Sequence, residues 1–360
     1  MAFSSVRIFQ FRNLDDTEIV FTDKDIYLIG ENGQGKTNFL EAIYLLCVGS
    51  SFRTRNESLL IKTGFREMSL TADFSDEGII RKIQFKLDRG KKSIRIDSKQ
   101  IRDRRELLAQ FPCIAFTHED INYVNGPPAL RRLFINQTIS LYDASFIDSL
   151  KTYNRVIKLR NKALKERRSD LLDIYDRQAA ESGLEVQKKR IKLIEEFNST
   201  FSYLFRNISG YNINLSIRYS PSWKTELSSD AVLSFIRENR NRDMMYKTST
   251  TGPHRDKIGF YADGRNYAAT ASTGQIRLIS LVLRASQAAF TADKSGLKPV
   301  LLLDDVLLEM DLKKRRRFLD YLPEYKQAFF TFLPDEGLVD YKESGPLYRV
   351  ENGRISGEEI

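Results

Sequence analysis

One segment near the N-terminus has the residue types and the spacing that bind a chain of phosphates. Gly30-Glu31-Asn32-Gly33-Gln34-Gly35-Lys36-Thr37 fits the P-loop pattern G-x-x-x-x-G-K-[ST]. Its glycines let the backbone wrap closely around phosphates, and its N–H groups and the next helix N-terminus favour their negative charge. Lys36 would neutralise the β- and γ-phosphates, and the Thr37 hydroxyl would ligate Mg²⁺. The segment therefore predicts ATP and Mg²⁺ as cofactors.

Two adjacent carboxylates follow an apolar run far along the chain. Val300–Leu303 leads directly into Asp304 and Asp305, as in a Walker B segment. In open α/β sheets, ligands bind at the carboxyl ends of the strands. We expect Asp304 to hold Mg²⁺ and Asp305 to polarise the water that attacks the γ-phosphate. The alternative is a solvated strand end.

A third segment, Ser272-Thr273-Gly274-Gln275, precedes a strongly helical run. A turn of this kind at a helix N-terminus suits a phosphate. In ATP-binding-cassette (ABC) ATPases the matching signature motif binds the γ-phosphate of ATP held by the partner subunit. Ser272, Gly274 and Gln275 are therefore predicted to contact nucleotide, and Asp311 matches the loop that crosses such a dimer interface. The alternative for the turn is a simple N-cap by Ser272 or Thr273.

The elements that must position these segments follow from hydrophobic patterning. Ile26–Ile29 is a short apolar run, typical of a buried parallel strand, and Asn38–Leu46 after the P-loop is helical in pattern; Asn38 is included among the nucleotide-binding residues. Gln327–Phe332 is a second apolar run of the same type. Residues 83–87 alternate between apolar and polar, which indicates a strand with one exposed face. The two ends of the chain thus predict one α/β layer.

The middle of the chain has helical periodicity and no proline between Pro128 and Pro221. The pattern predicts two long helices, with a break near Gly183, joined through residues 169–183. With about 30 residues in each helix, the antiparallel arm would be about 45 Å long. The fold class is therefore α/β: an ABC-type P-loop ATPase head, residues 1–125 and 245–360, with an inserted helical lobe like a short antiparallel coiled coil at residues 126–244.

Charge and composition restrict the partners. The chain has 360 residues, 41% hydrophobic, and a formal net charge of +9. Residues 81–105 have a net charge of +8 and residues 155–168 of +6, which favours a polyanion partner such as DNA. A solvated basic face is the alternative for either group. The candidate DNA contacts are Lys91, Lys92 and Arg95 in the head and Arg160, Lys162 and Lys165 on the arm.

Other function classes receive little support from the sequence. No apolar stretch is long enough to span a membrane, and Met1–Phe11 lacks the features of a signal peptide, so we expect a cytoplasmic protein without a membrane partner. Cys47 and Cys113 lie in apolar contexts and are predicted to be buried thiols. The two histidines, His118 and His254, are too few for a zinc site based on histidine.

Nearly the whole chain resembles the RecF family. The segments that carry the resemblance are Phe11–Leu14, Gly30–Asn38, Phe52–Thr54, Phe116–Asn122, Gly126–Phe134, Thr251–Asp256, Ser272–Arg277 and Leu301–Asp311. His118, Lys257 and Leu308 depart from residues usual in the family, which makes contacts with DNA or partners less certain but removes no phosphate or metal group.

The resemblance implies a homodimer in ATP that binds DNA at junctions and gaps between single- and double-stranded regions. It implies a slow, DNA-stimulated ATPase that acts as a switch, works with RecO and RecR to load RecA, and supports replication restart and the SOS response. Two other classes remain open at this point. One is the ATPase subunit of a transporter, which the long insertion and the basic segments disfavour; the other is a scaffold that binds nucleotide without hydrolysis, which Asp304 and Asp305 disfavour.

Overall fold

The computed structural model describes residues 2–76, 78–308, 310–334 and 345–358, which form two compact units. The first joins Met1–Asp120 with Arg284–Ile360, and the second is Ile121–Leu283. These borders differ from the expected domain borders at residues 125/126 and 244/245. Residues after 245 stay with the second unit because β10 (Lys257–Ala262) pairs with β9 (Ser216–Ser220). The functional division into a head and an arm stays a prediction.

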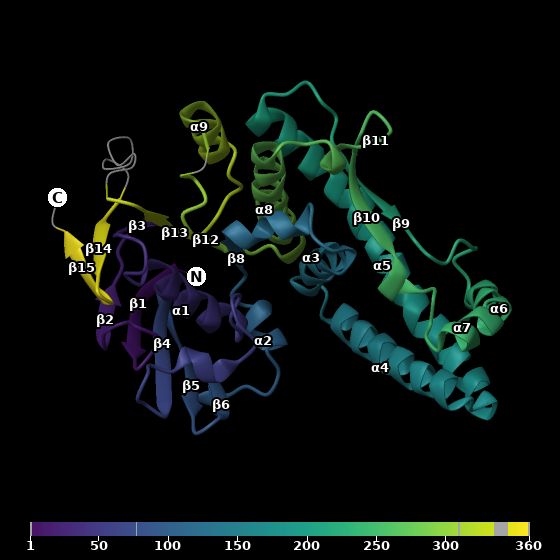
Figure 1. Ribbon diagram of the computed structural model, residues 1–360. Coiled ribbons are helices and arrows are strands. Elements are labelled where there is room, and N and C mark those ends of the chain that lie inside the picture. Colours follow the sequence, from purple (N-terminus) through teal and green to yellow (C-terminus); the bar gives the residue numbers. More distant parts are fainter. Residues whose placement is uncertain (1, 77, 309, 335–344, 359–360) are drawn as a thin grey trace. The chain divides into compact units, whose positions relative to one another are not determined.

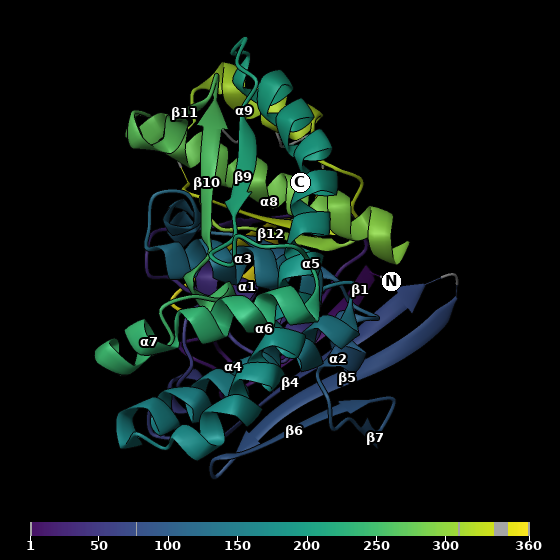
Figure 2. The ribbon, with the colours of Figure 1, turned by 90° about the vertical axis from the view of Figure 1, so that its right-hand side faces the viewer.

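The first unit contains an antiparallel sheet in the order β2-β1-β4-β5-β6-β7. Its alternating strands bury one face, as predicted: Ile83, Phe85 and Leu87 are buried. Figure 2 shows its two longest strands, β4 and β5, side by side. The strands are β1 Ala2–Phe9, β2 Thr17–Val20, β4 Glu67–Asp76, β5 Ile79–Asp88, β6 Lys91–Ile96 and β7 Lys99–Gln100.

The second sheet of the first unit has the order β15-β14-β3-β13-β12-β8. All its pairings are parallel except that of the edge strand β15. The apolar runs expected to be buried strands are β3, β12 and β13, and the last two are buried at every residue. The strands are β3 Asp25–Ile29, β8 Cys113–Phe116, β12 Val300–Leu303, β13 Gln327–Phe332, β14 Leu347–Glu351 and β15 Arg354–Glu358.

The helices of the first unit are few and mostly short. The longest that lies wholly in the unit, α1, begins at Lys36, so the last two residues of the P-loop form its first turn, and most of its residues are buried. The helices are α1 Lys36–Val48, η1 Glu57–Leu60, α2 Arg105–Leu108, η2 His118–Tyr123, which crosses the unit border, and α9 Leu312–Asp320.

The second unit is mainly helical, with a three-stranded antiparallel sheet in the order β11-β10-β9. Its last helix, α8, begins in this unit and ends in the first. Its elements are α3 Pro128–Ser140, α4 Ala144–Glu166, α5 Ser169–Ser209, β9 Ser216–Ser220, α6 Ser229–Glu238, α7 Arg240–Tyr246, η3 Pro253–Arg255, β10 Lys257–Ala262, β11 Arg265–Asn266, η4 Tyr267–Ala269 and α8 Thr273–Ser295.

Helices α4 and α5 form the predicted pair of long helices and lie side by side (Figure 1). The predicted linker is wrong: α5 runs without a break from Ser169 to Ser209, and only Arg167 and Arg168 separate the helices. Gly183 is a packing position inside α5, because a Cβ there would come within 2.4 Å of the Trp223 ring. Their unequal lengths, 23 and 41 residues, correspond to about 35 and 60 Å.

Among the described residues, no helix combines the length and the apolar character that crossing a membrane requires.

Candidate nucleotide site

The P-loop and the two carboxylates after β12 meet at one edge of the parallel sheet. Strands β3 and β12 both pair with β13, so their carboxyl ends lie two strands apart on the same side. The Thr37 hydroxyl donates a hydrogen bond of 2.7 Å to Asp304 Oδ1. A hydroxyl and a carboxylate are oxygen donors of the kind that Mg²⁺ prefers. The predicted metal residues are therefore adjacent in space although 267 positions separate them.

Asp304 is buried, with 8% of its surface exposed. Burial raises the pKa of its carboxyl group; the Thr37 hydrogen bond lowers it, and the charge of Asp305 raises it. A bound cation would offset this cost, because an opposite charge favours the ionised carboxylate. The electrostatics of the site therefore fit a metal ion beside Asp304.

Asp305 is held in a rare backbone conformation by a residue of β13. Its φ is 52°, its N–H donates to Thr331 Oγ1 at 2.7 Å, and the Thr331 hydroxyl donates back to Asp305 Oδ1 at 2.7 Å. Asp305 Oδ2 lies 3.7 Å from Lys36 Nζ. Thr331 was not among the predicted site residues; its one signal in the sequence is a hydroxyl between two phenylalanines in the second half of β13.

The P-loop has the backbone conformation that its glycines permit. Gly33 and Gly35 have φ angles of 81° and 122°, in the left-handed region that favours glycine. A Cβ on Gly35 would also come within 2.7 Å of Leu14 Cδ2. Lys36 is buried, and its ammonium group donates to the carbonyl oxygens of Gly30 at 2.6 Å and Glu31 at 3.3 Å.

A chain of polar side chains braces the P-loop from outside. Asn13 donates to the Gly33 carbonyl oxygen at 3.3 Å and accepts from Asn38 at 2.6 Å. Arg53 donates to Asn38 Oδ1 at 2.6 Å. Asn38, predicted to contact nucleotide, thus has two protein partners. In the sequence, Asn13 and Arg53 belonged only to segments that carry the family resemblance. In the structure their hydrogen bonds position the P-loop.

A buried carboxylate on α1 ties the same region together. Glu41 has no exposed surface, and the Arg12 guanidinium donates to its two oxygens, each at 2.9 Å. Ser51 donates to the same carboxylate, and Arg53 lies 3.6 Å from it. A bidentate charge-assisted pair of this kind is among the stronger polar contacts in proteins. Glu41 was not predicted as a site residue, because in the sequence it is only one position of a predicted helix.

The C-terminal hairpin closes over the middle of the P-loop. The N–H groups of Asn352 and Gly353 donate to the side-chain and backbone oxygens of Gln34, at 2.5 and 2.9 Å. A Cβ on Gly30 would come within 2.2 Å of the Val350 carbonyl oxygen. The hairpin β14–β15 therefore also positions the loop, although the two segments lie more than 300 residues apart in the chain.

The predicted signature residues lie in the second unit, at the start of α8. Ser272 Oγ accepts from the Gln275 N–H at 3.3 Å, and the Ser272 N–H donates to Gln275 Oε1 at 2.8 Å. This is a reciprocal capping box, and a Cβ on Gly274 would meet nothing within 4 Å. In a single chain the turn is thus an N-cap, as the alternative reading expected; its contact with a partner's nucleotide stays a prediction. Asp311 similarly caps α9 and accepts from the Lys314 N–H at 2.9 Å.

Five of the six predicted DNA contacts are exposed. Lys91 and Arg95 are exposed on β6, and Lys162 and Lys165 are exposed on α4. Lys92 lies 2.6 Å from Glu57.

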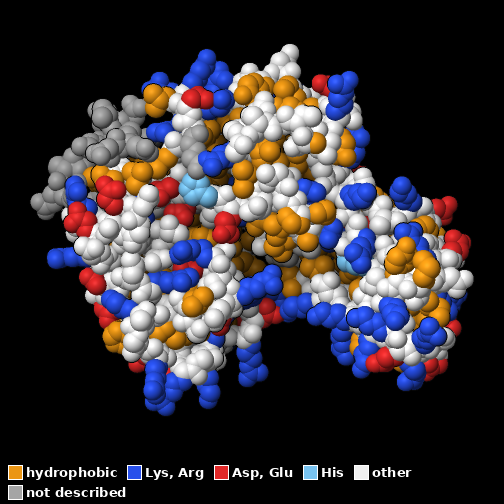
Figure 3. Space-filling model, viewed as in Figure 1, with side chains coloured by type: hydrophobic (Ala, Val, Ile, Leu, Met, Phe, Trp, Pro, Cys, Tyr) orange, Lys and Arg blue, Asp and Glu red, His pale blue; other side chains and the backbone are white. Residues whose placement is uncertain are grey.

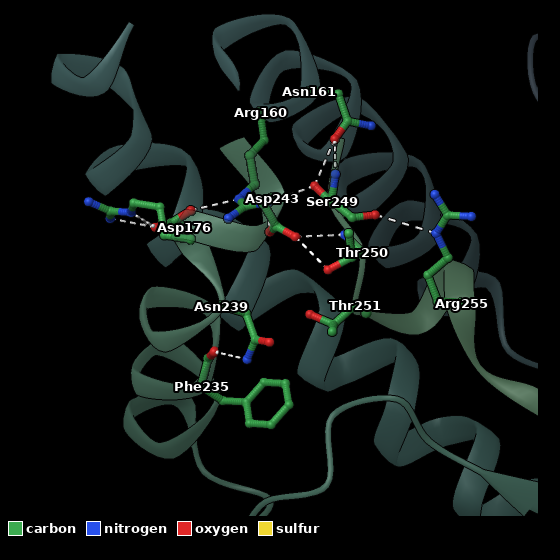
Figure 4. A network of polar contacts seen from close by, with 12 residues as sticks. Arg160, Asn161, Asp176, Phe235, Asn239, Asp243, Ser249, Thr250, Thr251 and Arg255 are labelled. Carbon is green, nitrogen blue, oxygen red and sulfur yellow. Dashed lines mark hydrogen bonds and ion pairs between the residues drawn. The ribbon is translucent and has the colours of Figure 1, made fainter. Parts of the chain in front are cut away.

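The prediction for Arg160 is wrong, because this side chain is only 2% exposed. It donates to Asp176 at 2.6 Å, Asp243 at 2.6 Å and Ser249 at 2.8 Å (Figure 4). Arg160 is thus part of the interior of the second unit.

The two cysteines are free and buried, as predicted. Among the described residues, no group of three or more His, Cys, Asp or Glu side chains could hold a metal ion by itself. A metal at Thr37 and Asp304 would therefore need other oxygen donors, such as nucleotide phosphates or water.

Comparison with known proteins supplies the family. The family described as RecF/RecN/SMC N terminal domain matches residues 2–355. The DNA replication and repair protein RecF of Treponema pallidum (strain Nichols) is 40% identical over 345 residues, which cover 95% of this chain and 97% of the relative. The RecF protein of Leptospira interrogans serogroup Icterohaemorrhagiae serovar Lai (strain 56601) is 31% identical over 364 residues, 99% of each chain.

Solved structures agree with the sequence relatives. The recombination mediator protein RecF with ATP, in the RecFOR pathway, superimposes with a TM-score of 0.89 at 28% identity and covers 99% of this chain and 98% of the other. An Smc head bound to the C-terminal winged-helix domain of ScpA has a TM-score of 0.59 at 16% identity and covers 100% and 99%; it supports the fold alone. The predicted fold class, an ABC-type head with a helical insertion, is confirmed, and the chain belongs to the RecF family of DNA replication and repair proteins.

Proposed function

We propose that this chain is an ATP-dependent DNA-binding protein of recombinational repair, in which ATP drives two copies together and the dimer binds DNA at gaps and junctions. The observation that carries the proposal is the convergence of Thr37 with Asp304 and of Lys36 with Asp305 at one sheet edge. This set supplies a phosphate counter-ion, two metal ligands and a carboxylate for the attacking water. A family whose named relatives are DNA repair proteins supplies the rest.

The residues would divide the work of ATP binding and hydrolysis as follows. The N–H groups of residues 30–37 cradle the phosphates, and Lys36 leaves the carbonyl oxygens of Gly30 and Glu31 to neutralise them. Thr37 and Asp304 would hold Mg²⁺, which would supply stabilisation of the charge that develops in the transition state. Asp305, fixed by Thr331, orients the attacking water.

The switch requires a second copy of the chain. The N-terminus of α8, with Ser272, Gly274 and Gln275, would bind the γ-phosphate of the nucleotide held by the other copy, and Asp311 would cross the interface. Hydrolysis removes that phosphate and releases the contact, so ATP state and dimerisation are coupled. A slow ATPase stimulated by DNA would keep the dimer closed on its target.

The partners follow from the family. RecF with ATP is described in the RecFOR pathway, which supports RecO and RecR as partners of this chain. In that role it would help to load RecA at gaps, and would support replication restart and SOS induction, in the cytoplasm. The head would be residues 1–125 with 245–360, and the inserted lobe residues 126–244.

The test is the affinity of the wild-type protein for a gapped DNA, measured by fluorescence anisotropy with Mg²⁺ and ATP, ADP or no nucleotide. ATP should tighten binding about tenfold or more, within the range usual for coupled sites. The Asp304→Ala variant serves as the control that should lose this dependence. Equal affinity of the wild-type protein in all three nucleotide states, or no binding, would contradict the proposal.

A further inference from the structure

Five cations form one straight row on α4. Lys151, Arg155, Lys158, Lys162 and Lys165 are spaced by four, three, four and three residues, and all are exposed. At 3.6 residues per turn they fall within an arc of about 80°. We call them the basic stripe. The buried side of the helix, with Tyr153, Val156, Ile157, Ala163 and Leu164, points the opposite way.

Most cations of the basic stripe have no carboxylate partner in the part of the chain that the structure describes. Lys162 lies 3.8 Å from Glu166, and no ion pair within the described residues engages the other four cations. Like charges three and four residues apart destabilise a helix. The favourable position of cations near a helix C-terminus accounts for Lys165 but not for Lys151. A row of cations that opposes folding, with a single ion pair among the described residues, points to a ligand of opposite charge.

The neighbouring helix shows what an ordinary solvated face of this unit looks like. The exposed side of α5 mixes Arg177, Lys188 and Lys192 with Glu181 and Glu185. Lys188 lies 3.9 Å from Glu185. In Figure 3, Lys and Arg side chains gather over α4. The concentration of one sign is therefore specific to the basic stripe and not a property of the whole arm.

The shape of the basic stripe selects among polyanions. It spans 15 residues, about 21 Å from first to last along a straight helix, and B-DNA carries about 12 negative charges over the same length. Single-strand binders interleave their cations with aromatic side chains on which bases stack. The two aromatic residues of α4, Phe146 and Tyr153, are both buried, so the exposed face offers no such platform. One exposed amide, Asn154, lies beside the basic stripe. The five long flexible cations dominate this face, and they fit phosphates rather than base edges.

We propose that the basic stripe of α4 binds the phosphate backbone of duplex DNA, independently of base sequence. This inference rests on the proposed function and adds the surface that the duplex contacts. Of the arm residues that the sequence predicted to contact DNA, the proposal retains Lys162 and Lys165 and leaves out Arg160. It adds Lys151, Arg155 and Lys158.

The experiment compares two triple variants of the full chain with equal changes in charge. The first is Arg155→Gln, Lys158→Gln and Lys162→Gln on the basic stripe; the matched control is Arg177→Gln, Lys188→Gln and Lys192→Gln on α5. Glutamine keeps helix propensity. Affinity for a blunt duplex and for a single strand is measured with ATP bound, at several salt concentrations, after circular dichroism and ATP affinity have shown that both variants fold.

The basic-stripe variant should lose about tenfold to a hundredfold in duplex affinity at low salt, and its salt slope should flatten by about one unit for each lost phosphate contact. The control should stay close to wild type. Equal behaviour of the two variants, or a loss confined to the single strand, would overturn the inference while leaving the proposed function in place. A wild-type protein that binds no DNA in ATP would remove the proposed function, and the inference with it.

A second measurement detects contact directly. Both native cysteines are buried, so a photo-crosslinker can be attached selectively at Lys158→Cys, with Lys188→Cys as the matched position on α5. Crosslinks to duplex DNA should form from position 158 and be at least about tenfold fewer from position 188. Equal yields would mean that the charge acts at a distance and that the basic stripe is not the contact surface.

Discussion

Replacing Arg160 by methionine should destabilise the second unit, although a sequence pattern assigns this residue to the DNA surface. The Arg160 guanidinium lies between Asp176 and Asp243, each at 2.6 Å, and Asp176 has no exposed surface. Methionine has a similar length and a good helix propensity. The change therefore isolates the charge and the hydrogen bonds from the packing of α4.

The magnitude follows from what each aspartate retains. Breaking a buried pair by removing one partner costs about 3–5 kcal/mol, because a buried charge is left uncompensated. Asp176 keeps Arg240, whose Nη2 lies 2.5 Å from it. Asp243 keeps the N–H and hydroxyl of Thr250, at 2.8 and 2.6 Å. We therefore expect a loss near the lower limit, about 3 kcal/mol.

The assay can be restricted to the relevant unit, because Trp223 is the single tryptophan of the chain. It is 1% exposed and packs against Tyr153 with ring centroids 6.3 Å apart. Urea unfolding followed by Trp223 fluorescence reports the second unit, with Lys162→Met as the control. That side chain is 70% exposed, and its loss should change stability by less than about 0.5 kcal/mol. An Arg160→Met protein within 1 kcal/mol of wild type, but with weakened DNA binding, would refute this reasoning and restore the surface assignment.

Three further variants test single residues. Asp305→Asn should keep ATP affinity, slow hydrolysis by about a hundredfold or more and leave the dimer closed. Asparagine tolerates the left-handed backbone at this position, but it lacks the carboxylate that orients the attacking water. Loss of ATP and Mg²⁺ binding in this variant would mean that Asp305, and not Asp304, holds the metal. Ser272→Arg should preserve the ATP affinity of the monomer and abolish dimerisation in sedimentation. Ser272→Ala should remove only the N-cap of α8, which costs about 1 kcal/mol of stability. If the arginine variant lost monomer ATP affinity as well as dimerisation, a role of Ser272 across the interface would be contradicted. Burial lowers the pKa of His254 to about 4, below the usual value of about 6.5, so the unfolded chain takes up the proton first as the pH falls. Between pH 7 and 4 the free energy of unfolding of wild type should therefore fall by about 3 kcal/mol more than that of His254→Gln. Urea unfolding at several pH values measures this difference, and parallel stability curves for the two proteins would exclude the linkage.

The parallel sheet was the part of the fold that the sequence specified best. Strands β12 and β13 are buried at every residue, and a short, continuous apolar run is what such a burial pattern requires. The P-loop pattern correctly predicted the turn after β3, because a loop that wraps around phosphates needs particular residues at fixed positions. Local patterns were sufficient wherever the physical requirement was local.

The arm was predicted less well because tertiary contacts override local signals. Gly183 reads as a helix breaker, but it lies inside α5 beneath the Trp223 ring. Arg160 reads as one member of a basic run, yet it falls in register with Tyr153, Ile157 and Leu164, the side of α4 that packs. That seven-residue register was visible in the sequence and separates Arg160 from the basic stripe.

The supports of the nucleotide site could not be found by spacing alone. Thr331 reaches Asp305 across neighbouring strands, and the β14–β15 turn binds Gln34 from more than 300 residues away. Glu41 is a buried acid in the stretch from Phe39 to Val48, whose other residues are all hydrophobic. These contacts depend on which strands become neighbours, and one chain's periodicity does not encode that order.

The central claim is that ATP held by the P-loop joins two copies of the chain on DNA. Sedimentation velocity of the wild-type protein and of Lys36→Ala, with and without ATP and Mg²⁺ and in the presence of labelled gapped DNA, tests it most directly. The wild-type protein should sediment as a dimer bound to the DNA only with ATP, and Lys36→Ala should remain a monomer in every condition, because the phosphates lose their fixed counter-ion. A Lys36→Ala protein that dimerises with ATP as the wild type does would contradict the account.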